Sequence, residues 1–238
     1  MKTKIHKSNI LLWVKNLCIT YGKKKILSDV NFDISAGEIV CLIWPNGAWK
    51  SSLIQCLLWT HSSFTWKVTR TGTRLWYVPQ KTSFSPYFSL QVKDFFALHT
   101  QVIDQLELQN LIKKFTIWQL LETKLSDLSW WEIQKVLLVY ALMSNPELLI
   151  LDEPTAWIDV LWEKTFYSTL LDVAKKWTAV LLVSHDVHAV LACADKILFL
   201  HACSCCVEHI HSWSPVHSTW VLWEYLAPFL HTHQQCKH

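Results

Sequence analysis

A Lys-Ser pair follows a short apolar run in the first quarter of the chain. The run spans residues 38–43, and Lys50, Ser51 and Ser52 open a segment of helical character. The residues between them are Trp44, Pro45, Asn46, Gly47, Ala48 and Trp49. A loop between a buried strand and a helix N-terminus can wrap phosphate groups with its backbone N–H groups. In that interpretation Lys50 contacts the outer phosphates and the Ser51 hydroxyl coordinates Mg²⁺.

Two positions of this loop carry the wrong residue type for that role. The phosphate-loop pattern is Gly, four residues, Gly, Lys and then Ser or Thr, and here Trp44 and Trp49 occupy the glycine positions. Glycine is needed where φ is positive and where a Cβ atom would collide with a phosphate. On this segment alone, a Lys-Ser pair that merely opens a helix remains an alternative.

Paired acids end a second apolar run. Residues 147–151 lead into Asp152 and Glu153, which predicts a buried parallel strand that brings carboxylates to its C-terminal edge. Asp152 would hold Mg²⁺ and Glu153 would polarise an attacking water. A further apolar run, residues 179–183, ends just before His185, which we expect to face the same site. The alternative is an ordinary acidic turn and a structural histidine.

The most specific segment consists of Leu128, Ser129, Trp130, Trp131 and Glu132. It resembles the Leu-Ser-Gly-Gly-Glu/Gln signature of ABC-type ATPases, with both glycines written as tryptophan. Other elements of that family follow in order between about residues 12 and 200: Tyr21 matches the aromatic residue that stacks on adenine, Gln80 the Q-loop, Asp159 the D-loop and His185 the switch histidine.

This resemblance implies an α/β fold. We expect a P-loop NTPase (ABC ATPase) core with a mostly parallel sheet, an antiparallel β edge and a helical signature subdomain. The residue pattern agrees, because residues 11–36 alternate like a hairpin and residues 85–142 have helical spacing. The expected organisation is a nucleotide-binding core with the β edge and phosphate loop (1–84), the helical signature subdomain (85–145), the remaining core with the acid strand, D-loop and switch histidine (146–210), and a tail containing His and Cys (211–238).

The resemblance also implies ATP hydrolysis with ATP and Mg²⁺ as cofactors. Two copies of the cassette pair head to tail, so that each ATP lies between the phosphate loop of one copy and Ser129 of the other. Glu153 and His185 act in hydrolysis, with Mg²⁺ held by Ser51 and Asp152 and sensed through Gln80. A membrane permease from another chain docks near Gln80 and the helical subdomain, which implies a peripheral location on the cytoplasmic face of the cell membrane.

Composition and length argue against several other function classes. The formal charge is only +3 and the basic residues are spread along the chain, which does not fit a nucleic-acid binder. The apolar stretch 179–200 is interrupted by charged and His residues, so it does not predict a membrane span. A soluble ABC ATPase of translation or DNA repair is a rival, although such proteins usually carry two cassettes or a coiled-coil insertion. A phosphate-loop kinase would not explain residues 128–132.

His and Cys residues gather near the C-terminus. Residues 201–211 resemble the last strand of metal-uptake cassettes and include Cys203, Cys205, Cys206, His209 and His211, and the tail adds His231, His233, Cys236 and His238. The resemblance to metal-uptake cassettes implies zinc or manganese as the cargo and an extracytoplasmic metal-binding protein as a partner of the system. The Cys and His residues, which are ligand types that Zn²⁺ takes, indicate a metal context only. A family strand followed by a solvated His-rich tail is an equal alternative, because the spacing is not that of a closed structural site.

The counts of glycine and tryptophan are abnormal. The chain has 4 Gly and 15 Trp, whereas glycine normally supplies about 7% of residues. In chains of the resembling family glycine is usual at Trp44, Trp49, Trp130, Trp131 and Trp157, and we extend this interpretation to Trp59, Trp66, Trp76, Trp118, Trp162 and Trp177.

We hypothesise a decoding difference as the cause. The codon UGA is read as tryptophan in one variant code and as glycine in another, and the chemically important residues of the motifs are intact. If the tryptophans are real, the alternative is a degenerate cassette that does not hydrolyse ATP.

Overall fold

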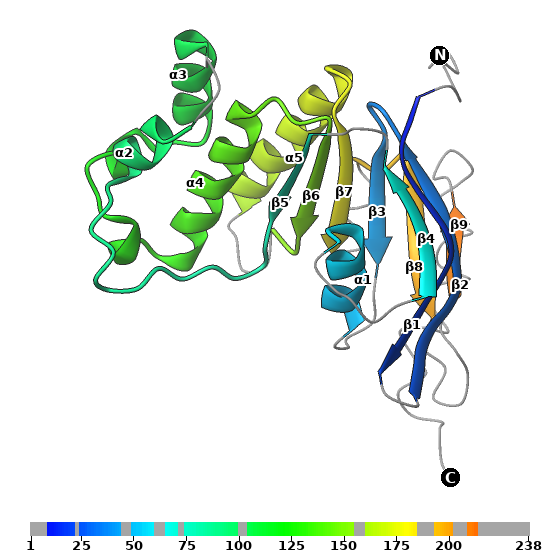
Figure 1. Ribbon diagram of the computed structural model, residues 1–238. Coiled ribbons are helices and arrows are strands. Elements are labelled where there is room, and N and C mark those ends of the chain that lie inside the picture. Colours follow the sequence, from blue (N-terminus) through cyan, green and yellow to red (C-terminus); the bar gives the residue numbers. More distant parts are fainter. Residues whose placement is uncertain are drawn as a thin grey trace.

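The computed structural model describes residues 9–21, 24–43, 49–59, 65–70, 74–99, 104–154, 160–184, 193–201 and 209–213. Within these ranges the strands form two sheets (Figure 1). The small sheet is antiparallel, with the order β2-β1-β4, and contains β1 (Ile10–Tyr21), β2 (Lys24–Ser35) and β4 (Thr65–Arg70). The large sheet has the order β5-β6-β7-β3-β8-β9 and contains β3 (Ile39–Ile43), β5 (Leu75–Val78), β6 (Leu148–Asp152), β7 (Ala179–Ser184), β8 (Lys196–His201) and β9 (His209–Trp213).

Five strands of the large sheet are parallel, and β9 pairs antiparallel with β8 at one edge. The central strands β3, β6 and β7 are buried along their whole length. Their continuous apolar sequences follow from this position, because a parallel strand covered on both faces has no solvent side for polar residues.

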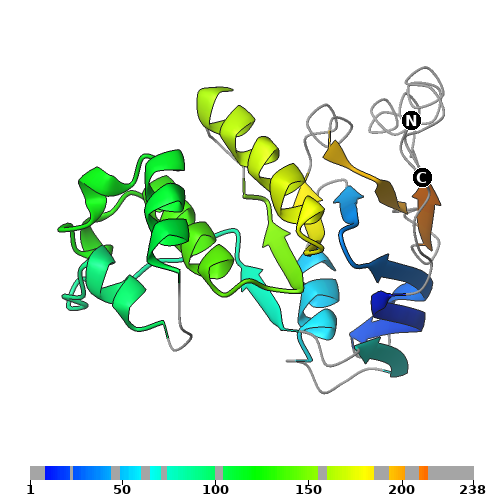
Figure 2. The same ribbon diagram turned by 90° about the horizontal axis from the view of Figure 1, so that it is seen from above.

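The helices are α1 (Trp49–Leu57), α2 (Val92–Ala97), α3 (Gln105–Lys114), α4 (Trp130–Met143) and α5 (Val160–Lys175), with short 3₁₀ helices η1 (Trp118–Leu120) and η2 (Leu125–Asp127). Figures 1 and 2 show α2, α3 and α4 gathered beyond the β5 edge of the large sheet, on the opposite side from the small sheet.

The large sheet separates two apolar cores. One core joins alternate residues of β3, β6 and β7 to α4, α5 and the helical region, and includes Phe96, Phe115 and Phe166. The other joins the opposite face of the same strands to α1 and the small sheet. The period of two along each strand therefore sends successive side chains into different cores.

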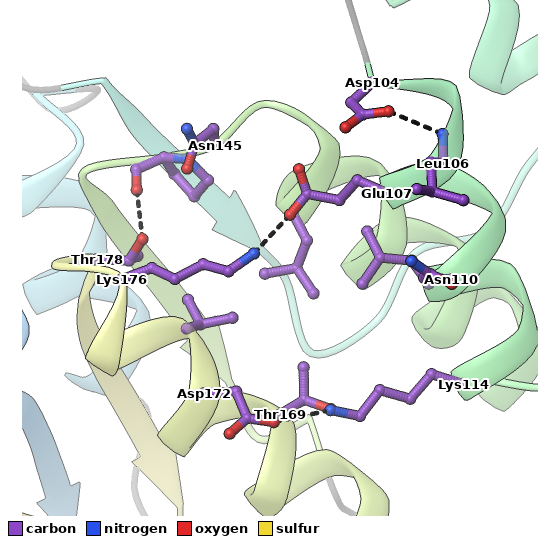
Figure 3. A pocket seen from close by; sticks show the side chains of 14 residues that line it. Asp104, Leu106, Glu107, Asn110, Lys114, Asn145, Thr169, Asp172, Lys176 and Thr178 are labelled. Carbon is purple, nitrogen blue, oxygen red and sulfur yellow. Dashed lines mark hydrogen bonds and ion pairs between the residues drawn. The ribbon is translucent and has the colours of Figure 1, made fainter.

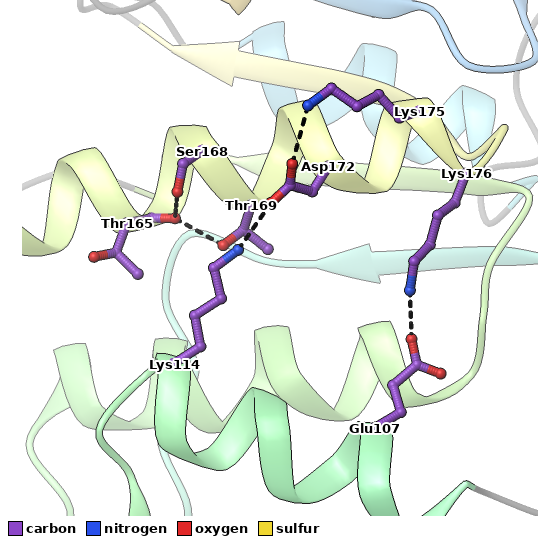
Figure 4. A network of polar contacts seen from close by, with 8 residues as sticks. All are labelled: Glu107, Lys114, Thr165, Ser168, Thr169, Asp172, Lys175 and Lys176. Atoms are coloured by element: carbon purple, nitrogen blue, oxygen red, sulfur yellow. Dashed lines mark hydrogen bonds and ion pairs between the residues drawn. The ribbon is translucent and has the colours of Figure 1, made fainter.

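Two ion pairs cross the joint between α3 and the C-terminal part of α5. Lys176 Nζ lies 2.7 Å from Glu107 Oε1, and Lys114 Nζ lies 3.2 Å from Asp172 Oδ2 (Figure 4). A cavity of about 680 Å³ opens beside them, with both apolar and charged side chains in its wall (Figure 3). The acid pair that ends β6 does not line this cavity.

The expected fold class is confirmed, including the hairpin at residues 11–36, the mostly parallel sheet and the helical region that carries residues 128–132. Strand β4, which extends the small sheet, was not predicted. The prediction of one strand at residues 201–211 was wrong, because His201 ends β8 and pairs with His209 at the start of β9. Among the described residues, no helix has both the length and the apolar character needed to cross a bilayer.

Candidate active site

Three neighbouring parallel strands, β6, β7 and β3, have their C-terminal ends side by side in the large sheet. Asp152 at the end of β6 pairs with Val183 of β7, and Ser184 of β7 pairs with Ile43 at the end of β3. The backbone N–H of Glu153 also donates to Val183 O at 2.8 Å. The segment after β3, the acid pair and the segment after β7 therefore start from neighbouring points.

Glu153 is the centre of the polar contacts at these strand ends. It forms an ion pair with Lys50 of α1, and its Oε2 accepts a hydrogen bond of 2.9 Å from Gln80 Nε2. Glu153 is buried and its φ is +43°, a conformation that non-glycine residues adopt rarely and that is frequent at functional sites. Residues 50, 80 and 153 come from three distant parts of the sequence, and the fold brings all three together.

Asp152 is buried beside this cluster. Its Oδ2 accepts a hydrogen bond of 3.4 Å from the Tyr77 hydroxyl. Burial raises the pKa of Asp152 above its ordinary value, and the Lys50 ammonium and the Tyr77 hydrogen bond oppose this rise. Burial likewise lowers the pKa of Lys50, while Asp152 opposes that change. Each of these charges is thus poorly solvated and favours an opposite charge close by.

Ser129 begins α4 through reciprocal contacts with Glu132. The backbone N–H of Ser129 donates to Glu132 Oε2 at 2.8 Å, and the Ser129 hydroxyl donates to the same oxygen, in a capping box. Trp130 and Trp131 occupy the first turn, with 38% and 42% of their surfaces exposed. The Lys135 ammonium lies 4.6 Å from the centre of the Trp131 ring.

Several predicted site residues lie outside the described residues: Trp44, Pro45, Asn46, Gly47, Ala48, Asp159 and His185. The side chains of Tyr21 and Trp49 also lie outside them. Of the remaining site residues, Ser51 is exposed in the first turn of α1 and Ser52 is buried. Leu128 is buried immediately before Ser129.

A profile of the ABC transporter family matches residues 27–156, which include Lys50, Gln80, the signature segment and both acids. The chain belongs to the ABC transporter family. The resemblance identified from the motifs is therefore confirmed, and the chain is an ATP-binding ABC subunit with ATPase activity coupled to transport.

Proteins named for zinc import are similar to this chain over most of its length. The zinc import ATP-binding protein ZnuC of Hydrogenovibrio crunogenus is 35% identical over 208 residues, which cover 82% of this chain and 81% of that protein. The protein of the same name from Magnetococcus marinus is 32% identical over 241 residues, which cover 98% of this chain and 92% of that protein.

Solved ABC structures share the fold. A structure described as the ATP-binding subunit of an ABC transporter superposes with a TM-score of 0.75 at 22% identity, covering 92% of this chain and 93% of the other. CbiO1 from Clostridium perfringens, described as part of the ABC transporter complex cbiONQ, superposes with a TM-score of 0.70 at 19% identity. The superposition covers 92% of this chain and 95% of the CbiO1 chain.

Two polar residues of this ABC site were missed by the sequence analysis. Tyr77 contacts Asp152, and Gln134 donates to Pro79 O and Gln80 O, the carbonyl oxygens on either side of the Gln80 Cα atom. A local signal existed for Gln134, because it is a polar residue between the apolar residues Ile133 and Val136 of a helix. No local signal marks Tyr77, whose partner is 75 residues away.

The ends of α1 and α5 give independent support for the interpretation of the tryptophans. Trp177 has φ +70°, and its N–H donates to Ala174 O while the next N–H donates to Val173 O, the pattern of a Schellman helix end. Trp59 has φ +60° and donates to Cys56 O at the end of α1. Glycine is the usual residue in this left-handed position, because a side chain there is strained.

The exposure of the tryptophans points the same way. Six of the eight tryptophans whose side chains the structure describes are more than one third exposed. A native indole is normally largely buried. The fold therefore does not bury most of these indole rings in an apolar core.

Proposed function

We propose that the chain hydrolyses ATP to drive the import of zinc. The observation that carries the proposal is the assembly of Lys50, Gln80, Asp152 and Glu153 beside the C-terminal ends of β3, β6 and β7. The cargo follows from the similarity over most of the chain to proteins named for zinc import. Manganese, the other ion predicted from the sequence, is an outcome that the test must separate from zinc.

The residues of the site fit Mg²⁺, which prefers oxygen ligands. Asp152 supplies a buried carboxylate whose raised pKa reflects the need for a positive neighbour, and Ser51 supplies a hydroxyl at the start of α1. Bound there, the ion would neutralise charge on the phosphates.

The residues of the proposed site have separate roles. Lys50 leaves Glu153 and binds the outer phosphates. Glu153, thus freed, accepts a proton from the attacking water, and Gln80 keeps its contact with the Glu153 carboxylate and orients that water. His185 assists Glu153, Tyr21 stacks on adenine, and Asp159 belongs to the contact between the two copies.

The proposed partners are a membrane permease and a second copy of the cassette, with an extracytoplasmic metal-binding protein elsewhere in the system. The permease surface includes the segment after Gln80, where Tyr87 is 95% exposed and Phe88 stacks on Phe84. Docking to a permease would hold the chain at the cytoplasmic face of the membrane, which is the location that we propose. The division into 1–84, 85–145, 146–210 and 211–238 is part of the same proposal.

Activity requires glycine at four motif positions. Trp44 and Trp49 flank the phosphate loop, and Trp130 and Trp131 stand where the signature backbone approaches the partner's nucleotide. We propose that all four are glycine in the protein made by the cell. The codons decide this directly: UGA at these positions supports the proposal, and UGG leaves a degenerate cassette.

The activity test uses the full chain carrying Trp44→Gly, Trp49→Gly, Trp130→Gly and Trp131→Gly, which we call the four-glycine variant. We expect this variant to hydrolyse ATP, and we expect Glu153→Gln in the same background to lower kcat by at least about 100-fold. Cells that express the variant together with its partner permease are then tested for zinc uptake and for manganese uptake, and the ion that is taken up identifies the cargo. ATP hydrolysis that survives Glu153→Gln unchanged would refute the assigned mechanism.

A further inference from the structure

Gln134 is a buried amide with no role in the mechanism described so far. It lies in α4 with only 3% of its surface exposed. Its Nε2 donates to Pro79 O at 2.7 Å and to Gln80 O at 2.8 Å, so both amide hydrogens are used. Its Oε1 accepts no hydrogen bond among the described residues.

This arrangement is costly for a residue that only fills space. A buried acceptor without a hydrogen-bond partner destabilises the folded chain, whereas methionine fills a similar volume without leaving a polar atom unpaired. Glutamine differs from methionine in making two hydrogen bonds to the backbone of residues 79 and 80. The contact therefore points to a role in holding the backbone at Gln80.

The backbone at this point has few other restraints. Strand β5 ends at Val78, and Pro79 has no N–H group with which to continue the sheet ladder. Gln134 contacts the carbonyl on each side of the Gln80 Cα atom, and the direction of a side chain depends on the backbone that carries it. The Gln80 amide in turn reaches Glu153, which also binds Lys50.

Gln134 also connects this backbone to the signature segment. It is five residues beyond Ser129 on the same helix, and the capping box with Glu132 fixes the start of that helix. The helix is a rigid connection between Ser129, which serves the partner's nucleotide in the proposed function, and Gln80, which serves the chain's own.

We propose that Gln134 is a positioning residue, an inference that rests on the proposed ATPase function. Gln134 holds the backbone at Gln80 so that the Gln80 amide reaches Glu153, and it couples this position of Gln80 to the signature segment. Gln134 does not touch the reacting atoms. It acts through Gln80, so its removal has an effect only while Gln80 is present.

The first test needs no nucleotide. Hydrogen exchange is compared in the full chain, in Gln134→Met and in Val139→Ala, a control that disturbs the apolar packing of the same helix. We expect Gln134→Met to raise deuterium uptake at residues 80–84 several-fold, and Val139→Ala to leave uptake there unchanged. Equal uptake in the chain and in Gln134→Met would overturn the proposal.

The second test uses the four-glycine variant in a double-mutant cycle. We expect Gln134→Met to lower kcat about tenfold, with the KM for ATP within about twofold, and to have no effect once Gln80→Ala is present. Losses that multiply in the double variant would show that Gln134 does not act through Gln80 and would overturn the proposal. If the four-glycine variant itself lacks ATPase activity, the proposed function fails, and the exchange experiment still decides the role of Gln134.

Discussion

At the scale of single residues, the carboxyl group of Asp152 is buried in the folded chain. Because burial raises the pKa of this group, the folded chain binds the carboxyl proton of Asp152 more tightly than the unfolded chain does. Ionised Asp152 therefore lowers the free energy of unfolding as the pH rises from about 4, the ordinary pKa of aspartate, through the raised value.

We expect Asp152→Asn to stabilise the nucleotide-free chain in a pH-dependent way. The Tm of the variant should exceed that of the parent at pH 7, and this difference in Tm should disappear toward pH 4. Thermal denaturation at a series of pH values measures the difference. An offset that is the same at every pH would contradict this account.

Asp172 provides a control of opposite sign. Hydrogen bonds from Lys114 and Lys175 lower the pKa of this exposed carboxyl group. Its contribution to stability is therefore present above the ordinary pKa and is lost as the pH falls through the lowered one. Asp172→Asn should lower the Tm slightly at pH 7 and have no effect at the acid end of the series.

At the scale of elements, helix ends test whether tryptophan belongs at the positions where it is written. We expect Trp177→Gly to raise the free energy of unfolding by about 1 kcal/mol, because it removes the strain of a side chain at φ +70°. Trp59→Gly should gain less, because the Trp59 ring also contacts the Arg70 guanidinium at 4.0 Å. Urea titration measures both changes.

Trp13 is the control for this prediction, because it is not one of the positions interpreted as glycine. It is 50% exposed, but it lies in β1 and its φ is not positive. Trp13→Gly should therefore lower the free energy of unfolding, by about 0.5–1 kcal/mol. If the three substitutions have the same sign, helix-end strain is not the cause.

The joint between α3 and α5 depends little on its ion pairs. Lys176 and Glu107 are both more than half exposed, and such pairs contribute about 0–1 kcal/mol. We expect Lys176→Ala to lower the free energy of unfolding by less than about 1 kcal/mol, with a smaller effect in high salt. Lys175→Ala, which breaks a pair within α5 only, is the control, and a loss of several kcal/mol in Lys176→Ala would contradict this view.

The elements that carry the site were predictable because their signals are local. β6 and β7 are apolar runs that end in polar residues, and α4 begins with a Ser-to-Glu capping box that is visible in the sequence. The contacts of Gln134 with residues 79 and 80 span more than 50 residues, and no local pattern encodes them. The pairing of β4 with β1 was missed for the same reason.

At the scale of the whole molecule, the large sheet organises the chemistry. It separates two apolar cores. The C-terminal ends of β3, β6 and β7 lie side by side in it, and Lys50 meets the acid pair there. The signature segment lies on a helix beyond the β5 edge (Figure 2). The two segments to which we assign nucleotide contacts therefore lie on separate parts of one copy, which agrees with the head-to-tail pairing that we propose.

The central claim is that this architecture binds ATP against bare backbone at the phosphate loop. Calorimetric titration of Mg-ATP into the chain as written and into the four-glycine variant tests it most directly. We predict binding by the variant with a Kd of about 1 μM–1 mM, the usual range for enzyme substrates, and binding at least about 100-fold weaker by the chain as written. Equally tight binding by both proteins would contradict the claim.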